Sequence, residues 1–248
     1  MSKRQEIRQR RKRERMRNRV LVIILVVLGA VLVTVALVLP SIINARNAAS
    51  ATQTAENATP VPVVTIVPRI FNAPVDRLHI GNPNALVKVD VYEDFRCSAC
   101  LYYTQNYEPQ VITNYVETGK VYYTYHAFIV IDGNDGTDAS RRAANAALCA
   151  SEQGRFWDYH DTLYANQLSE SATLFTDARL VTMAENLKLD MTAFNQCYQA
   201  KKYDQEIQND ISTAISLNLQ GTPSILVNGQ LTSMDKVTSA IDTALAGK

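Results

Sequence analysis

The feature that most constrains this chain is a Cys-x-x-Cys motif, Cys97 to Cys100, at the junction of two sequence patterns. The apolar run 85–92 before it predicts a buried strand, and the run 101–115 after it is compatible with a helix. The first turn of a helix has unpaired N–H groups and a partial positive charge, which favour an anion. A cysteine there becomes more acidic. We therefore expect Cys97 to be the attacking thiol and Cys100, one turn along the same face, to be the resolving thiol.

Two other uses of a Cys-x-x-Cys motif compete with thiol exchange. A structural zinc knuckle needs a second Cys/His pair at short spacing. The remaining cysteines, Cys149 and Cys197, are isolated in helical segments, and the chain has only three histidines. A purely structural Cys97–Cys100 disulfide would be an inefficient brace, because so short a loop constrains little of the unfolded chain. The sequence favours redox chemistry with no metal and no cofactor.

Residues 20–39 contain no charged side chain. At about 1.5 Å per residue this run spans about 30 Å, the thickness of the apolar core of a bilayer. The alternative is a signal peptide, but its apolar core is usually only about 7–15 residues long, and Ala49-Ser50-Ala51 is a weak cleavage candidate. We expect one uncleaved transmembrane helix that anchors the chain in the cell membrane.

The charge distribution predicts the orientation of that helix. Residues 1–19 carry ten basic and two acidic residues, which leaves 15 basic and 22 acidic residues in the rest of the chain. A basic tail can bind nucleic acid, but beside a membrane helix it indicates a cytoplasmic end, so no nucleic-acid partner is expected and the rest lies outside. Residues 40–68 are rich in Ala, Thr, Asn, Val and Pro and predict a flexible linker.

The globular domain is expected at 69–248. Strand-like runs at 121–126 and 225–227 join the first strand, and the pattern from 140 to 217 is helical throughout. Several helices between two strand regions indicate a helical insertion, about 138–205. This order predicts an α/β fold.

Several local signals refine this outline. Residues 79–85 and 132–136 read as turn and loop, and an EF-hand at 132–136 is excluded because the required glutamate is missing. Pro109 should kink the helix that follows the cysteines. Thr176-Asp177 and Asp190 are expected to cap helices. Asn228-Gly229 predicts a hairpin with a return strand from Leu231, followed by a helix over 235–245.

Three stretches carry a resemblance to a known family. The strand, Asp94-Phe95-x-Cys-x-x-Cys and helix resemble the active-site entry of DsbA-like thiol–disulfide oxidoreductases of the thioredoxin superfamily. Gly221 to Ser224 resembles the cis-proline loop that lies opposite the Cys-x-x-Cys in that superfamily. The run 143–161, with Phe156-Trp157 and His160-Asp161, resembles the helical insertion of DsbA-like proteins. Together the matches span roughly 69–248.

The resemblance implies a thioredoxin fold with an inserted α-helical domain. It also implies that Thr222 and a cis Pro223 present backbone to an extended substrate peptide. Some DsbA-like proteins carry an extra structural bridge, which Cys149 and Cys197 would form here. Closing so long a loop would stabilise the fold by up to about 4 kcal/mol. The alternative is two buried free thiols.

The implied function is thiol–disulfide exchange on exported proteins with free thiols, with reoxidation by a quinone-linked membrane partner. Ser98-Ala99 replaces the Pro-His of strong oxidases, so the redox direction stays open between disulfide formation and a reductase or isomerase. The rival from another class is a non-catalytic anchored binding or chaperone module. Glu93 or Asp94 could accept a proton from Cys100, whereas His79, His126 and His160 are expected to be structural.

Overall fold

The computed structural model describes residues 61–247. The expected basic tail, the membrane helix at 20–39 and the linker residues 40–60 lie outside the described residues. No helix within 61–247 is both long and apolar enough to cross a bilayer. Contacts group the chain from Val61 onward into one compact unit.

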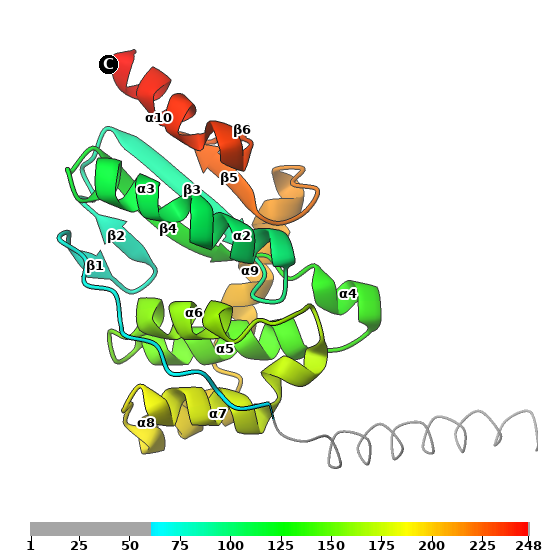
Figure 1. Cartoon of the computed structure of the whole chain (residues 1–248). Coiled ribbons are helices and arrows are strands. Elements are labelled where there is room, and N and C mark those ends of the chain that lie inside the picture. Colours follow the sequence, from blue (N-terminus) through cyan, green and yellow to red (C-terminus); the bar gives the residue numbers. More distant parts are fainter. Residues whose placement is uncertain (1–60, 248) are drawn as a thin grey trace, which may run out of the picture. The chain divides into compact units, whose positions relative to one another are not determined.

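The centre of this unit is a six-stranded sheet with the order β1-β2-β4-β3-β5-β6 (Figure 1). The central strands β3 and β4 are parallel, and β5 is antiparallel to β3. The expected strands are therefore confirmed to within a few residues, whereas the turn expected at 79–85 contains the short strand β2. The strands are β1 Val75–Asp76, β2 His79–Gly81, β3 Val87–Glu93, β4 Val121–Ala127, β5 Ser224–Val227 and β6 Gln230–Thr232.

Helices cover both faces of the sheet. Helix α10 (Val237–Ala246) packs on β5 and on α3 (Glu108–Val111), whereas α9 (Asp204–Ser216) packs on β4. The face under α9 is sealed by a small apolar cluster that includes Tyr92, Phe128 and Leu219. The residues of β3 are apolar or buried except Lys88 and Asp90, which are half-buried, as expected of a central strand covered on most of both faces.

The helix after the cysteines is divided. Helix α2 (Ser98–Asn106) ends before Tyr107, and α3 then leads into a π-helical turn, Ile112–Val116. Pro109 lies in the first turn of α3, where the missing N–H has no partner to lose. The predicted kink is therefore a break two residues before the proline.

The helical insertion forms a separate layer beside the sheet (Figure 1). Its centre is α5, an alanine-rich helix that is buried along nearly its whole length. Thr176 and Asp190 cap helices as expected, because their side chains accept N–H groups of the first turns of α7 and α8. The helices are α5 Ala139–Ser151, α6 Phe156–Ala165, α7 Asp177–Asn186 and α8 Met191–Gln199, with a 3-10 turn at Ala172–Phe175.

The loop expected at 132–136 is instead the short helix α4 (Ile131–Asp135). Its first turn contains Asp132, whose carboxylate accepts the N–H groups of Ser140 and Arg141. These contacts tie α4 to α5, and such tertiary contacts override the Gly- and Asp-rich local signal.

The hairpin at the end of the sheet is as predicted. Asn228 and Gly229 have φ values of 49° and 78°, the left-handed backbone of a type I′ turn. A 3-10 turn, Met234–Lys236, then leads into α10.

The segment before β1 lies across the helical insertion (Figure 1). The Asn166 side chain accepts the N–H of Val64 at 2.7 Å and donates to its carbonyl at 2.9 Å. Arg69 then reaches Asp161 of α6 and Glu108 of α3. The ordered contacts of the globular unit thus begin several residues before Arg69.

Candidate active site

Cys97 and Cys100 lie at the start of α2, directly after the end of β3. Cys97 is the N-cap residue and is 7% exposed, whereas Cys100, one turn on, is fully buried. Both are free thiols in this structure. In its protonated form, the Cys97 thiol donates to the carbonyl oxygen of Thr222, which lies 3.3 Å from the sulfur. The two thiols and the Thr222 loop, which are far apart in the sequence, are therefore in contact.

The surroundings of the two sulfurs make their acidities differ. A hydrogen bond from the Cys100 thiol, helped by the N–H groups of Ala99 and Cys100, lowers the pKa of Cys97 to about 6, although partial burial opposes this. Complete burial raises the pKa of Cys100 well above the ordinary thiol value, and the nearby Cys97 and Glu93 raise it further. At neutral pH Cys97 is thus largely a thiolate while Cys100 keeps its proton.

The Thr222–Pro223 loop lies beside the thiols because of strand pairing. Ser224, the first residue of β5, pairs with Tyr92 near the end of β3. This register brings the residues before Ser224 to the end of the sheet where α2 begins. The Thr222–Pro223 peptide bond is cis.

The two acidic residues at the end of β3, Glu93 and the following Asp94, serve different purposes. Asp94 accepts the N–H groups of Arg96, Val130 and Ile131, each at 2.9 Å, so its carboxylate holds the loop together. Glu93 is 1% exposed and contacts Nε2 of His160 at 3.3 Å. Among the described residues, Glu93 Oε1 has no hydrogen-bond partner. Of the two carboxylates, Glu93 is the one whose charge raises the pKa of Cys100, whereas the Asp94 carboxylate is occupied by loop N–H groups.

A chain of buried polar side chains continues from Glu93 toward solvent. Nδ1 of His160 contacts Asp161 at 2.9 Å, and Asp161 accepts two hydrogen bonds from Arg69, at 2.5 and 2.6 Å. Arg69 and Asp161 line a pocket of about 290 Å³ beside α2, together with Leu101 and Thr104. The buried carboxylate is thereby connected to the surface.

Burial and pairing set the charges along this chain. Burial raises the pKa of Glu93, although the hydrogen bond with His160 opposes the shift. Burial alone would lower the pKa of His160, but its contacts with Asp161 and Glu93 raise it to about 9. Burial opposes the charge on Asp161, yet His160 and Arg69 hold the pKa of that carboxyl below its usual value. The chain therefore holds a proton on His160 at neutral pH.

Comparison with known proteins agrees with this geometry. The sequence profile of a family described as thioredoxin matches residues 72–245. The chain belongs to the DsbA-like members of the thioredoxin family. It is 30% identical over 172 residues to the probable disulfide bond formation protein D of Bacillus anthracis, covering 67% of this chain and 77% of that protein.

Two further comparisons concern Bacillus subtilis. Its disulfide bond formation protein D is 23% identical over 188 residues, covering 73% of this chain and 81% of that protein. The crystal structure of oxidised BdbD from the same organism superposes with a TM-score of 0.62 at 21% identity, covering 75% of this chain and 100% of that chain. This DsbA-like chain thus has the thioredoxin fold with its helical insertion, and it is a protein thiol–disulfide oxidoreductase.

A second carboxylate lies at the first turn of α2 in this DsbA-like protein. Oε1 of Glu170 accepts the backbone N–H of Ser98 at 3.1 Å and the Ser98 hydroxyl at 2.9 Å. The backbone of Glu170 is held by the Arg96 guanidinium, which donates to its carbonyl oxygen. Arg96 is 1% exposed and also pairs with Asp132 and Asp135 of α4.

Reasoning from the sequence did not find His160, Asp161, Arg69 or Glu170 as part of the site. They come from an N-terminal segment, a helix and a loop far from the cysteines, and no spacing rule connects them. The resemblance did mark His160-Asp161 as a shared feature, which was the one available signal. His126 is structural, as expected, because it lies between Asp90 and Asp210.

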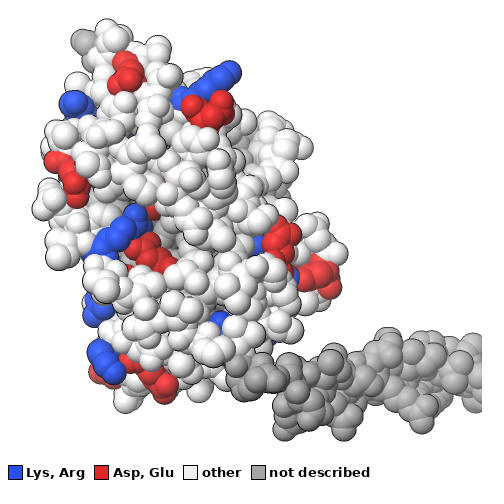
Figure 2. Space-filling model, in the orientation of Figure 1, with Lys and Arg blue, Asp and Glu red and all other residues white. Residues whose placement is uncertain are grey.

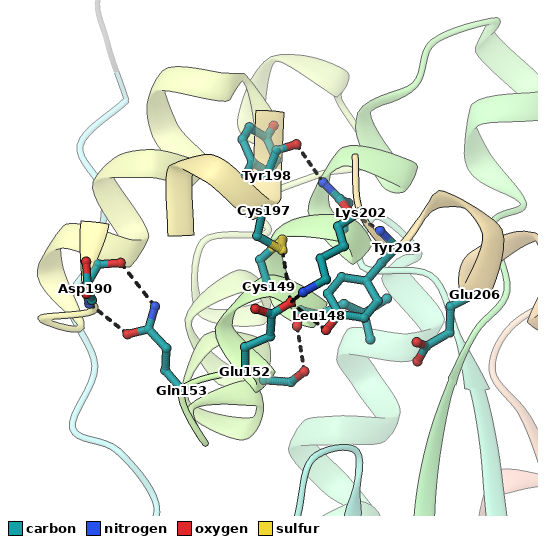
Figure 3. Close-up of a disulfide and its surroundings, with 12 residues drawn as sticks. Leu148, Cys149, Glu152, Gln153, Asp190, Cys197, Tyr198, Lys202, Tyr203 and Glu206 are labelled. Atoms are coloured by element: carbon teal, nitrogen blue, oxygen red, sulfur yellow. Dashed lines mark hydrogen bonds and ion pairs between the residues drawn. A yellow bond between two sulfur atoms is a disulfide. The ribbon is translucent and has the colours of Figure 1, made fainter. Parts of the chain in front are cut away.

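Cys149 of α5 and Cys197 of α8 form a disulfide (Figure 3). Their Cα atoms are 5.8 Å apart and 48 residues separate them in the sequence. Glu152 lies beside the bridge and accepts from Lys202 at 2.7 Å and from the Tyr203 hydroxyl at 2.8 Å. The bridge belongs to the helical layer and takes no part in the contacts of Cys97.

The described residues contain no candidate metal site. Within residues 61–247, no group of three or more His, Cys, Asp or Glu side chains could hold a metal ion. On the face in Figure 2, charged side chains are sparse and mostly occur as neighbouring groups of opposite sign. That face has no continuous basic patch of the kind that binds nucleic acid.

Proposed function

We propose that this oxidoreductase forms disulfides in exported proteins. The observation that carries the proposal is the contrast between its two thiols. The lowered pKa of Cys97 makes it a good leaving group and stabilises the reduced protein, which makes the disulfide form a better oxidant. The buried Cys100, whose pKa is raised, is suited to resolving mixed disulfides.

The exchange runs in two displacement steps. A substrate thiolate attacks the Cys97 sulfur of the Cys97–Cys100 disulfide, and Cys100 leaves as a thiolate and takes up one proton. The second substrate thiolate attacks the substrate sulfur of the mixed disulfide, and Cys97 leaves as a thiolate. Two electrons pass from the substrate to the protein, which ends as a Cys97 thiolate and a Cys100 thiol.

The proton for Cys100 comes from the buried chain beneath it. Glu93 carries a free carboxylate oxygen and contacts His160, which holds a proton at neutral pH. Transfer through Glu93 neutralises the buried Cys100 thiolate, which burial would otherwise make unstable. Asp161, at the pocket beside α2, lets His160 regain a proton from solvent. Reoxidation reverses this path.

Thr222 and Pro223 are proposed to hold the substrate peptide. The Thr222 carbonyl lies 3.3 Å from the Cys97 sulfur, so a peptide cysteine that attacks Cys97 must approach that backbone. Backbone pairing of an extended peptide would give affinity without demanding one sequence.

The compartment follows from the N-terminal sequence. A helix over 20–39 with a cytoplasmic basic tail would hold residues 61–247 outside the cell membrane, where thiols are oxidised. A quinone-linked membrane protein is the proposed reoxidising partner. In intact cells, a thiol label that cannot cross membranes should reach Cys97 of the reduced protein. Labelling that requires lysis would contradict this topology.

Two assays separate the proposed function from its rivals. An oxidase accelerates refolding of reduced ribonuclease, whereas a reductase accelerates the reduction of insulin more strongly. A non-catalytic binding module is inert in both assays, and Cys97→Ser would then change nothing. Stronger insulin reduction than ribonuclease oxidation by the full chain, in buffers of defined glutathione ratio, would overturn disulfide formation as the function.

A further inference from the structure

The first turn of α2 serves two anionic groups at once. The N–H groups of Ala99 and Cys100 stabilise the Cys97 thiolate, while the N–H of Ser98 donates to Glu170. Ser98 and Glu170 are both exposed, so this contact lies at the surface beside the reactive sulfur. A carboxylate and a thiolate therefore compete for the positive end of one helix.

The carboxylate of Glu170 is held in place and is not a freely moving surface group. The buried Arg96 guanidinium donates to the Glu170 carbonyl, and the Ser98 hydroxyl gives the carboxylate a second hydrogen bond. Arg96 itself does not neutralise that carboxylate, because its charge is paired with Asp132 and Asp135 of α4. The negative charge of Glu170 thus lies at the N–H of Ser98, the residue next to Cys97, without a cationic partner among the described contacts.

We propose that Glu170 is a tuning residue of the redox pair, whose charge disfavours the Cys97 thiolate and thereby weakens the protein as an oxidant. This inference rests on the proposed role of Cys97 as the attacking thiol. Glu170 touches only Ser98 in the active-site helix, so it acts by positioning charge and takes no part in the exchange itself. Glu170 belongs to the helical insertion. The insertion would in this way influence the redox equilibrium of the Cys97–Cys100 pair, which lies on the thioredoxin fold.

Other charged groups near Cys97 lie on the remaining sides. Glu93 at the end of β3 and His160 of α6 lie beneath the pair, and the Cys100 thiol lies behind it on α2. On the Thr222 side, the contact is an uncharged carbonyl. A change at Glu170 leaves all of these groups in place, so its effect on Cys97 can be measured separately.

The test compares Glu170→Gln with the wild-type full-length protein. Gln keeps the size of the side chain and an oxygen that accepts from Ser98, so only the charge is lost. Exposed charges interact weakly, so the pH midpoint of Cys97 alkylation should fall by about 0.1–0.7 in Glu170→Gln. The same interaction should move the equilibrium with glutathione by about 1.4-fold to fivefold toward the reduced protein.

Two controls make the result specific. Glu185→Gln removes an exposed charge on α7, away from the cysteines, and should leave both measurements unchanged. Raising the salt concentration from about 0.05 to about 0.5 M should shrink the difference between wild type and Glu170→Gln, because salt screens exposed charges. A merely structural role of Glu170 would instead change the melting temperature and leave the alkylation midpoint where it was.

An unchanged or higher alkylation midpoint in Glu170→Gln would overturn the inference. Failure of the proposed function has a different signature. In that case the wild-type protein would show no acidic Cys97, or Cys97→Ser would still exchange disulfides, whatever residue stands at position 170.

Discussion

The two cysteine pairs of this protein consist of the same residue type but differ in bonding and in position. Cys97 and Cys100 are three residues apart at a helix start and are free thiols, whereas Cys149 and Cys197 lie within two helices, 48 residues apart, and are bonded. A bridge between distant residues removes much more freedom from the unfolded chain than a bridge across one helical turn. The difference teaches that position in the helices decides whether a pair stabilises the fold or exchanges electrons.

Their surroundings reinforce this division. The Cys97 sulfur contacts a carbonyl oxygen, helix N–H groups and the Cys100 thiol. The N–H groups and the Cys100 thiol favour its thiolate form. The bridge between α5 and α8 is instead enclosed by the helical layer. Each pair can therefore be changed without direct contact with the other, which the following variants exploit.

The largest effect is expected from the reactive pair itself. Cys97→Ser should reduce disulfide exchange to the uncatalysed rate, because no attacking thiol remains. Cys100→Ser should keep the attacking thiol and lose the resolving one, so mixed disulfides with substrates accumulate in oxidising cells. Non-reducing gels of the purified proteins, with and without reductant, show the adducts. Adducts through Cys100 in Cys97→Ser would reverse the two roles.

The structural pair should respond in the opposite way. Replacing both Cys149 and Cys197 by Ala should lower the free energy of unfolding by up to about 4 kcal/mol. For a domain of this size, that corresponds to a fall in melting temperature of roughly 8–16 °C. The exchange rate at moderate temperature should stay near that of the wild type. Loss of exchange with an unchanged melting temperature would make this pair an electron relay.

Only the reactive pair is expected to depend on proton transfer, through the buried carboxylate of Glu93. Glu93→Gln keeps the side-chain size but removes the group proposed to exchange a proton with Cys100, so oxidation of the reduced protein should slow by about 10²-fold. Asp94→Asn is the matched control, since Asp94 holds loop N–H groups and should affect stability more than the rate. Stopped-flow oxidation by glutathione measures the step. Equal slowing in both variants would argue against a special role for Glu93.

The last prediction concerns the pH dependence of stability. The pKa of Cys97 is lowered to about 6 in the folded reduced protein, whereas an unfolded cysteine titrates at about 8.5. A lowered folded pKa stabilises the reduced protein above about pH 8.5, and this contribution is lost as the pH falls to about 6. As the pH falls from about 8.5 to about 6, the free energy of unfolding of the reduced protein should therefore decrease relative to that of the oxidised protein. Melting curves of both forms at several pH values provide the measurement, and a difference that does not vary with pH would exclude an acidic Cys97.

Local sequence signals predicted much of the fold. The strand, motif and helix around Cys97, the Asn228-Gly229 hairpin and the caps at Thr176 and Asp190 depend on neighbouring residues, and the structure contains them. The exceptions have tertiary causes. Most of the expected loop at 132–136 lies in helix α4 because Asp132 reaches the start of α5 and the Arg96 side chain.

The site was predictable only in part for the same reason. The cysteines and the Thr222–Pro223 loop carry recognisable motifs. The path from Glu93 to solvent joins side chains from β3, α6 and the segment before β1, and a lone histidine on a helix gives no signal of such a connection. Glu170 is harder still, because its meaning depends on which N–H group it meets.

The segment that precedes β1 has a mechanical consequence. Tension applied to the chain at Val61 is resisted first at the helical layer, where Arg179 holds the Val61 carbonyl and Asn166 holds Val64 through two hydrogen bonds. The next contact along the chain is the ion pair between Arg69 and Asp161, and Asp161 also contacts His160. A pull from the N-terminal side therefore loads the contacts of Val61 and Val64 with the helical layer before it loads the strands. Once those contacts break, the next one to break is the ion pair between Arg69 and Asp161.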